Sequence, residues 1–216
     1  MKNKIVLAIL FFLPLTVYLF FATGVNLFDK LPVVKENIEE INYFESENVS
    51  LEGNITVLGF LGKDVIAKRA IVYNLALKIY KPYYQFEDLQ FVWIVSEENK
   101  EEVIQLKAAL ENISKIDKWN FVYGSDEEII SFFNQLHTDF NQLHTDENLD
   151  ANYSSTQVYI IDKDKNLRGR NEVEETVGYD ISTPAAINNK LRDDIKILLA
   201  EYRLALKKNN RYKREI

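Results

Sequence analysis

The order of short apolar runs and helical stripes constrains the fold of this chain more than any other feature. Residues 55–60 and 89–95 are nearly continuous apolar runs of the kind that buried strands show, and residues 119–123 alternate as a strand does. Between these runs, residues 64–80 and 97–113 place apolar side chains at helical spacing. Strands that alternate with helices in this way predict a sheet with parallel strands.

The last part of the chain departs from this alternation. Residues 157–161 predict a further strand, and the polar turn at 162–166 leads directly into 167–170, which indicates an antiparallel hairpin. Thr183 before Pro184 marks the start of a last helix, because proline is tolerated at the first helical position.

This order predicts an α/β chain with a thioredoxin-like mixed sheet flanked by helices. A doubly wound nucleotide-binding fold is the alternative, but it would need a glycine-rich turn after the first strand. Gly62 is the one glycine in that turn, and Lys63 and Asp64 follow it.

Residues 1–26 predict a membrane anchor, one transmembrane helix that precedes the domain. Residues 5–21 carry no charge, and about 20 apolar residues suffice to cross a bilayer. A cleaved signal peptide is the alternative, although its apolar region is usually only about 7 to 15 residues long. Lys2 and Lys4 on the short N-terminal side predict a single-pass protein whose domain lies on the exported, periplasmic side of the lipid bilayer.

The remainder of the chain divides into three parts. Residues 27–52 mix charges with isolated apolar residues and predict a linker with one short strand near 41–44. Residues 53–208 predict the thioredoxin-like domain, and residues 209–216 a basic tail. The basic end of the last helix suits the helix dipole, or it contacts acidic lipid headgroups or an acidic protein.

Composition limits the chemistry of the chain. It has 33 acidic and 26 basic residues and a formal net charge of -7, which disfavours nucleic acid as a partner. It has no cysteine, so its core must hold without disulfides and it has no thiolate to act as nucleophile or soft metal ligand. We therefore expect neither an enzyme nor a bound cofactor.

Three segments resemble the SCO/SenC family, thioredoxin-fold proteins that are anchored by one N-terminal helix and implicated in assembling the copper centre of cytochrome oxidase. The segments are residues 55–62 (ITVLGFLG), 118–129 (KWNFVYGSDEEI) and 155–169 (STQVYIIDKDKNLRG). The resemblance spans about residues 53–202, and it implies the fold, the anchor and a place in the cell envelope.

The copper ligands of that family are missing here. They are a Cys-x-x-x-Cys pair at the start of the first helix and a histidine before a later strand, and the resemblance places Lys63, Ala67 and Ser154 at these positions. The chain therefore resembles a degenerate member of the family. This implies a membrane-anchored, non-catalytic binding or accessory protein with a protein partner in respiratory oxidase assembly.

The alternative is an SCO-like copper chaperone or thiol-disulfide protein that uses non-standard ligands. Histidine suits copper, and the two histidines, His137 and His144, lie in a tandem repeat of FNQLHTD at residues 133–139 and 140–146. In a helix, a spacing of seven residues separates them by about 10.5 Å, too far for one ion. We expect a local duplication rather than a metal or pH-sensing site.

An aromatic cluster follows the first predicted helix. Tyr80, Tyr83, Tyr84 and Phe86 gather around Pro82. They can fill the core, or they can form a patch that binds a protein partner, because exposed aromatic side chains anchor interfaces. The three tyrosines are the candidate partner contacts.

Overall fold

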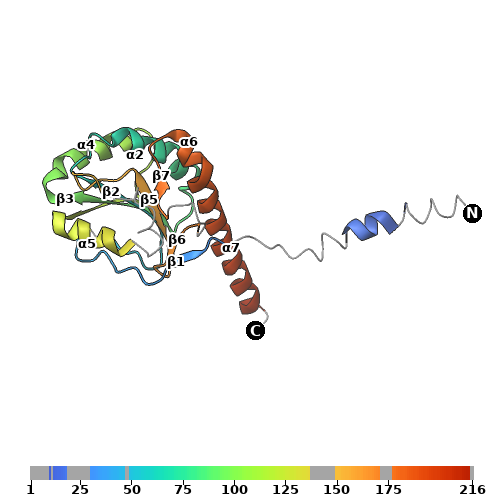
Figure 1. Ribbon diagram of the computed structural model, residues 1–216. Helices are drawn as coiled ribbons and strands as arrows, with labels where there is room; N and C mark the ends of the chain where they lie inside the picture. The colour runs from blue at the N-terminus through green and yellow to red at the C-terminus, as the bar shows by residue number, and fades with distance from the viewer. Residues whose placement is uncertain are drawn as a thin grey trace, which may run out of the picture.

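The computed structural model describes residues 10, 12–18, 30–46, 49–136, 149–170 and 177–214, with side chains as far as residue 205. A mixed β-sheet forms its centre, and helices pack on both faces (Figure 1). This is the thioredoxin-like α/β architecture that the order of elements predicts.

Sixteen elements make up the described part from residue 30 onward. The strands are β1 (Val33–Lys35), β2 (Ile55–Gly62), β3 (Leu89–Ser96), β4 (Trp119–Gly124), β5 (Gln157–Ile161), β6 (Leu167–Arg168) and β7 (Tyr179–Asp180). The helices are α2 (Arg69–Leu75), η1 (Ala76–Tyr80), α3 (Lys81–Tyr83), η2 (Glu97–Asn99), α4 (Lys100–Glu111), α5 (Asp126–Leu136), α6 (Pro184–Ala186), η4 (Ile187–Leu191) and α7 (Arg192–Arg214).

The sheet has the strand order β1-β6-β5-β2-β3-β4, and β7 pairs with β5 beside this path. The strands β2, β3 and β4 are parallel, whereas β5 is antiparallel to both β2 and β6. Every residue of β2 and β3 is buried, as expected for central strands covered on both faces. The two edges of the sheet are β1 and β4.

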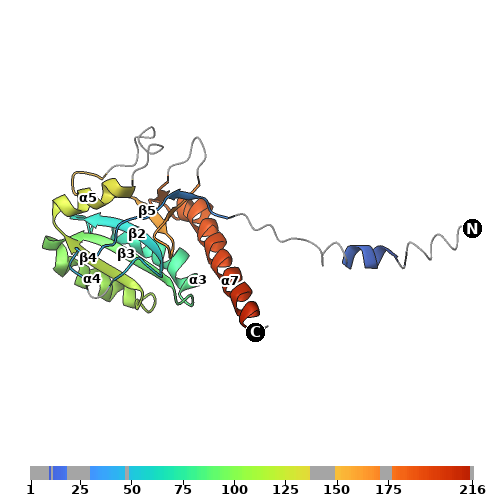
Figure 2. The same ribbon diagram turned by 90° about the horizontal axis from the view of Figure 1, so that it is seen from below.

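Two apolar clusters fill the two faces of the sheet. The first lies under α2, η1, α4, η4 and α7 and includes Phe91, Trp93 and Leu198. The second lies under α5 and includes Phe60 and Phe132. Figure 1 shows α5 on the opposite side of the sheet from α2 and α4, and both views show α7 extending past the sheet (Figures 1 and 2).

Two predicted helix starts are confirmed by capping hydrogen bonds. The N–H of Ser125 donates to Glu128 Oε2 (2.8 Å), and the N–H of Glu128 donates to Ser125 Oγ (3.3 Å), which is a capping box at the start of α5. The N–H of Ala186 donates to Thr183 Oγ1 (3.2 Å), with Pro184 at the first position of α6.

The predicted hairpin is confirmed as well. Residues 162–166 join β5 to the antiparallel strand β6. Asp162 Oδ1 accepts the N–H groups of Asp164 (3.0 Å) and Asn166 (2.9 Å), so the acidic side chain closes the turn.

The first helix differs from its prediction. The sequence predicts a helix over 64–80, but α2 begins at Arg69 and the helical path continues through η1 and α3 to Tyr83. No side chain caps the start of α2, and the N–H of Lys68 donates to the C=O of Asp64 (2.9 Å) in a turn. The loop after β2 is therefore longer than the spacing suggests.

The segment expected to be a linker, residues 27–52, packs on the sheet wherever it is described. Its strand β1 pairs with β6. Five of its apolar side chains are at most 3% exposed: Leu31, Ile38, Ile41, Phe44 and Leu51. These side chains lie at intervals of seven and three residues, but the segment forms turns and a bridge rather than a helix, so their spacing alone did not predict their burial.

The short strand expected near residues 41–44 is absent from that stretch. One residue further on, Glu45 forms a single antiparallel bridge with Tyr123 of β4. The N–H and C=O groups of these two residues exchange hydrogen bonds of 2.9 and 3.0 Å.

Most of the predicted anchor, residues 1–26, lies outside the described residues. A short helix is described at 12–18. Within the described part of the chain, no helix combines the length and the apolar character that crossing a membrane requires. The transmembrane helix and the signal peptide both remain predictions.

Candidate functional site

The candidate site lies where the loop after β2 meets the segment before β5. Gly62 ends β2 with φ +49°, and the N–H of Lys63 donates to the C=O of Asn152 (2.8 Å). A Cβ at Gly62 would lie 2.1 Å from the oxygen of Asn152, so only glycine permits this approach. Tyr153 in the facing segment also has a positive φ, 57°, which is unusual for a bulky residue.

Ser154, at the position that the resemblance assigns to the histidine, is buried with 1% of its surface exposed. Its Oγ lies 2.6 Å from Asp150 Oδ2 and 3.0 Å from Asp64 Oδ2. A hydroxyl has one proton, so it donates to one of the two carboxylates at a time. Asn152 Nδ2 donates to Asp64 Oδ1 (2.9 Å) and thereby ties the same two segments together.

Asp150 is the acceptor that organises the segment before β5. Burial alone would raise its pKa, but hydrogen bonds from the hydroxyl and N–H of Ser154 and from the N–H of Asn152 outweigh burial and hold the pKa below its ordinary value. Lys68 Nζ lies 3.3 Å from Asp150 Oδ2 and acts in the same direction. The carboxylate is therefore stabilised in its charged form.

Lys63 and Ala67 occupy the positions that the resemblance assigns to the two cysteines. Lys63 Nζ lies 2.8 Å from Asp126 Oδ2 at the start of α5 and 5.2 Å from the centroid of the Tyr153 ring. The hydrogen bond to Asp126 is the main reason that the pKa of Lys63 is raised above its ordinary value. Ala67 lies in the turn at 65–68 with an exposed side chain.

The structure thus brings Ser154 next to Asp64 and places Lys63 against the same segment. Three carboxylates that complete the cluster, Asp64, Asp126 and Asp150, were missed by the sequence analysis. Their partners are 63 to 90 residues away, apart from the bonds that Asp150 accepts from Asn152 and Ser154, so no local motif predicts the cluster.

The contacts that the structure shows in this cluster are hydrogen bonds and ion pairs. Among the described residues, no group of three or more His, Cys, Asp or Glu side chains is placed to hold a metal ion. The predicted alternative ligands, His137 and His144, lie outside the described residues.

The three candidate partner tyrosines have different environments. Tyr80 is 2% exposed and packs edge-on against Phe91 and Trp119, with ring centroids 5.3 and 5.5 Å away, so it belongs to the core rather than to a surface patch. Tyr83 is half-buried against the same core, and Tyr84 is 42% exposed. A partner contact remains a prediction for Tyr83 and Tyr84.

The strand order, the antiparallel hairpin and the two helical layers define a thioredoxin-like domain. No family model matches the sequence, and no curated protein matches it. Solved structures do match.

BsSco, described as a member of the Sco family of cytochrome c oxidase assembly proteins, is similar with a TM-score of 0.51 and 16% identity, over 77% of this chain and 94% of that chain. A SCO1/SenC family lipoprotein from Bacillus anthracis is similar with a TM-score of 0.51 and 19% identity, over 82% of this chain and 99% of that chain. Both neighbours are from the family that the three sequence segments resemble. At these identities the likeness establishes the fold.

Proposed function

We propose that this chain is a membrane-anchored, non-catalytic accessory protein of the cell envelope that acts in respiratory oxidase assembly by binding a protein partner. The structural likeness to Sco-family proteins supports the assembly role, and the uncharged residues 5–21 support the anchor.

The observation that carries the non-catalytic part is the composition of the candidate site. A thioredoxin-like domain performs exchange or copper ligation through thiolates, and this chain has no cysteine. Where the resemblance expects ligands, Lys63 is paired with Asp126 and Ser154 is bonded to two carboxylates. These side chains stabilise the loop geometry, and binding through the surface is what the domain can still do.

Affinity purification of the tagged full-length protein from its native membrane, in mild detergent, followed by mass spectrometry, tests this proposal. Oxidase subunits or their assembly factors should accompany the protein. The variant Tyr84→Ala should reduce their recovery if the exposed tyrosine contributes to the interface. Ile104→Ala is the control, since Ile104 is 66% exposed on α4 and lies in a different element. Failure to recover any oxidase component with the unaltered protein would contradict the proposed role.

A copper titration of the full-length protein separates this proposal from the copper-chaperone alternative. We expect no tight binding of Cu(I), because the chain has no thiolate and its one methionine is residue 1. Tight binding that is lost in the double variant His137→Ala, His144→Ala would favour the alternative instead.

A further inference from the structure

The last three turns of α7 leave the body of the domain. Earlier in the same helix, Leu198 and Leu199 are at most 5% exposed against the core. Arg203, Leu204 and Ala205 are all exposed, although successive residues of a helix point in different directions. Both views show the helix continuing past the sheet (Figures 1 and 2). The helix therefore projects from the domain from about residue 203 onward.

The projecting part is basic, whereas the rest of the chain is acidic. Residues 203–214 include six basic residues and no acidic one, which leaves 20 basic residues against 33 acidic ones elsewhere. The helix dipole favours cations only within the last turn, so it does not account for a basic run of three turns. At about 100° per residue, four of the six positions fall within about 80° of one another around the helix axis. These four form the basic stripe: Arg203, Lys207, Arg211 and Arg214.

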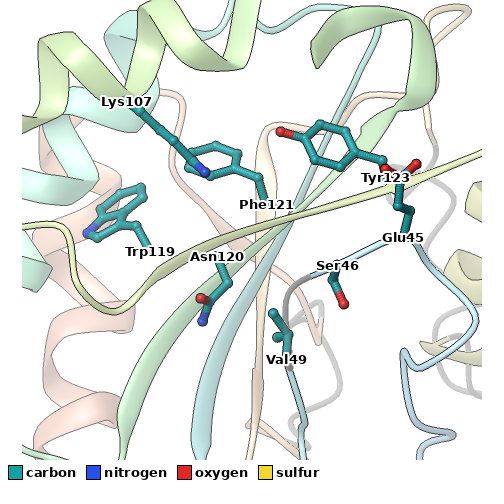
Figure 3. Close-up of a pocket in the computed structure, with 8 residues that line it drawn as sticks. All are labelled: Glu45, Ser46, Val49, Lys107, Trp119, Asn120, Phe121 and Tyr123. Carbon is teal, nitrogen blue, oxygen red and sulfur yellow. The ribbon is translucent and has the colours of Figure 1, made fainter.

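On the body of the domain, several basic side chains lie against groups of the domain itself. Lys63, Lys68 and Lys100 pair with carboxylates. Lys107 Nζ lies 5.3 Å from the centroid of the Phe121 ring, in the groove beside β4 that Figure 3 shows. The basic stripe has no acidic residue within its own three turns, so its charge suits a partner of the opposite sign.

The start of the described domain lies beside the point where this helix leaves it. Arg168 Nη2 donates both to the C=O of Leu31 (2.5 Å) and to Glu201 Oε2 (2.8 Å), and Arg168 is only 5% exposed. Glu201 lies two residues before Arg203, where α7 becomes exposed. The chain therefore enters the domain next to the base of the basic stripe.

The predicted anchor is close to the same place. It is predicted for residues 1–26, and the five residues from there to Leu31 span at most about 17 Å. From Glu201 to Arg214 the helix is about 20 Å long. A bilayer that holds the anchor is therefore no farther from Leu31 than the length of the projecting helix.

We infer that the basic stripe of α7 binds a lipid surface with anionic headgroups, beside the anchor. Basic residues near such a surface are attracted to it, and the attraction falls off within about 10 Å at 0.1 M salt. The proximity of the stripe to the anchor favours lipid over an acidic protein as the partner. This inference rests on the anchor of the proposed function and adds a lipid contact to it.

The test uses the full-length protein in nanodiscs of two compositions, phosphatidylcholine alone and phosphatidylcholine with phosphatidylglycerol. Hydrogen exchange in the fragment that covers residues 203–214 should be about tenfold slower in the anionic nanodiscs, because each basic residue near an anionic surface adds to the attraction. The difference should disappear at about 1 M salt, where the Debye length falls to about 3 Å.

Two double variants assign the effect to the basic stripe. Lys207→Glu with Arg211→Glu reverses charge within the stripe and should abolish the difference between the nanodiscs. Lys78→Glu with Lys115→Glu makes the same change in net charge at exposed positions outside α7 and should keep it.

Three results would overturn the inference. Equal exchange in the two nanodiscs, as expected if an acidic protein is the partner, would leave the anchor and the protein-binding role intact. A difference that survives Lys207→Glu with Arg211→Glu would mean that another surface meets the lipid. Failure of the protein to insert into either nanodisc would contradict the anchor, and the inference with it.

Discussion

Replacing Gly62 by alanine tests the geometry of the candidate site directly. The backbone at Gly62 has φ +49°, and a residue with a side chain loses about 1–2 kcal/mol in this left-handed region. The added Cβ would also lie 2.1 Å from the oxygen of Asn152 and 2.5 Å from the carbonyl carbon of Tyr153. Both are backbone atoms, so they cannot rotate away, and such overpacking costs about 1–3 kcal/mol. The two contributions together predict a loss of about 2–5 kcal/mol in the free energy of unfolding.

The variant Gly53→Ala is the matched control. Gly53 also has a positive φ, +80°, but no atom lies within 4 Å of a Cβ built there. It should therefore show only the backbone contribution of about 1–2 kcal/mol. The difference between the two variants isolates the contact between Gly62 and the segment before β5.

Thermal unfolding of the full-length protein, followed by circular dichroism in one detergent, measures this difference. For a chain of this length, about 1 kcal/mol shifts Tm by roughly 2–4 °C. Gly62→Ala should unfold several degrees below Gly53→Ala. Equal Tm values for the two variants would refute the reasoning, because they would mean that the segment before β5 does not lie against Gly62.

Three further predictions concern stability. Arg168→Met should lower the free energy of unfolding by about 3–5 kcal/mol in urea titrations, because it leaves the buried carboxylate of Asp162 without its cation at 2.8 Å; a loss below about 1 kcal/mol would contradict this. Because the pKa of Asp150 is lower in the folded protein, its ionised carboxylate stabilises the fold fully above the unfolded pKa of about 4, and this stabilisation is lost as the pH falls through the folded pKa. Asp150→Asn should therefore flatten the decline in Tm below about pH 4, and an acid unfolding profile that stays unchanged in this variant would count against the prediction. Ser125→Ala should cost about 1 kcal/mol through loss of the cap of α5, measured by the same urea titration; no loss would show that the capping box is dispensable.

The elements predicted well from the sequence are those that a local pattern specifies. β2, β3 and β5 are runs of apolar residues between turn signals, and the cap at Ser125 and the proline at 184 mark helix starts within a few residues. Each of these signals depends on neighbours along the chain, so one sequence suffices to find it.

The buried N-terminal segment and the polar cluster could not be found in this way. Ile38 and Phe44 are buried because they meet the face of the sheet that α5 also covers, a contact that depends on the assembled domain. The pairs Lys63 with Asp126 and Asp64 with Ser154 join residues 63 and 90 positions apart. The resemblance predicts Lys63, Ala67 and Ser154 as positions of interest, and the fold shows which carboxylates lie next to Lys63 and Ser154.

The chain has no cysteine, and the bonding at the candidate site agrees with that composition. A catalytic thiolate needs an accessible loop start, because a partner sulfur or metal must reach it. Here Gly62 fixes the segment before β5 against that loop, and the buried hydroxyl of Ser154 lies within hydrogen-bonding distance of two carboxylates. Lys63 and its partner Asp126 remain partly exposed. Their side chains can form polar contacts, but they offer neither a nucleophilic sulfur nor a soft metal ligand. The described side chains of this loop are therefore arranged for hydrogen bonds and ion pairs between the loop and the segment before β5.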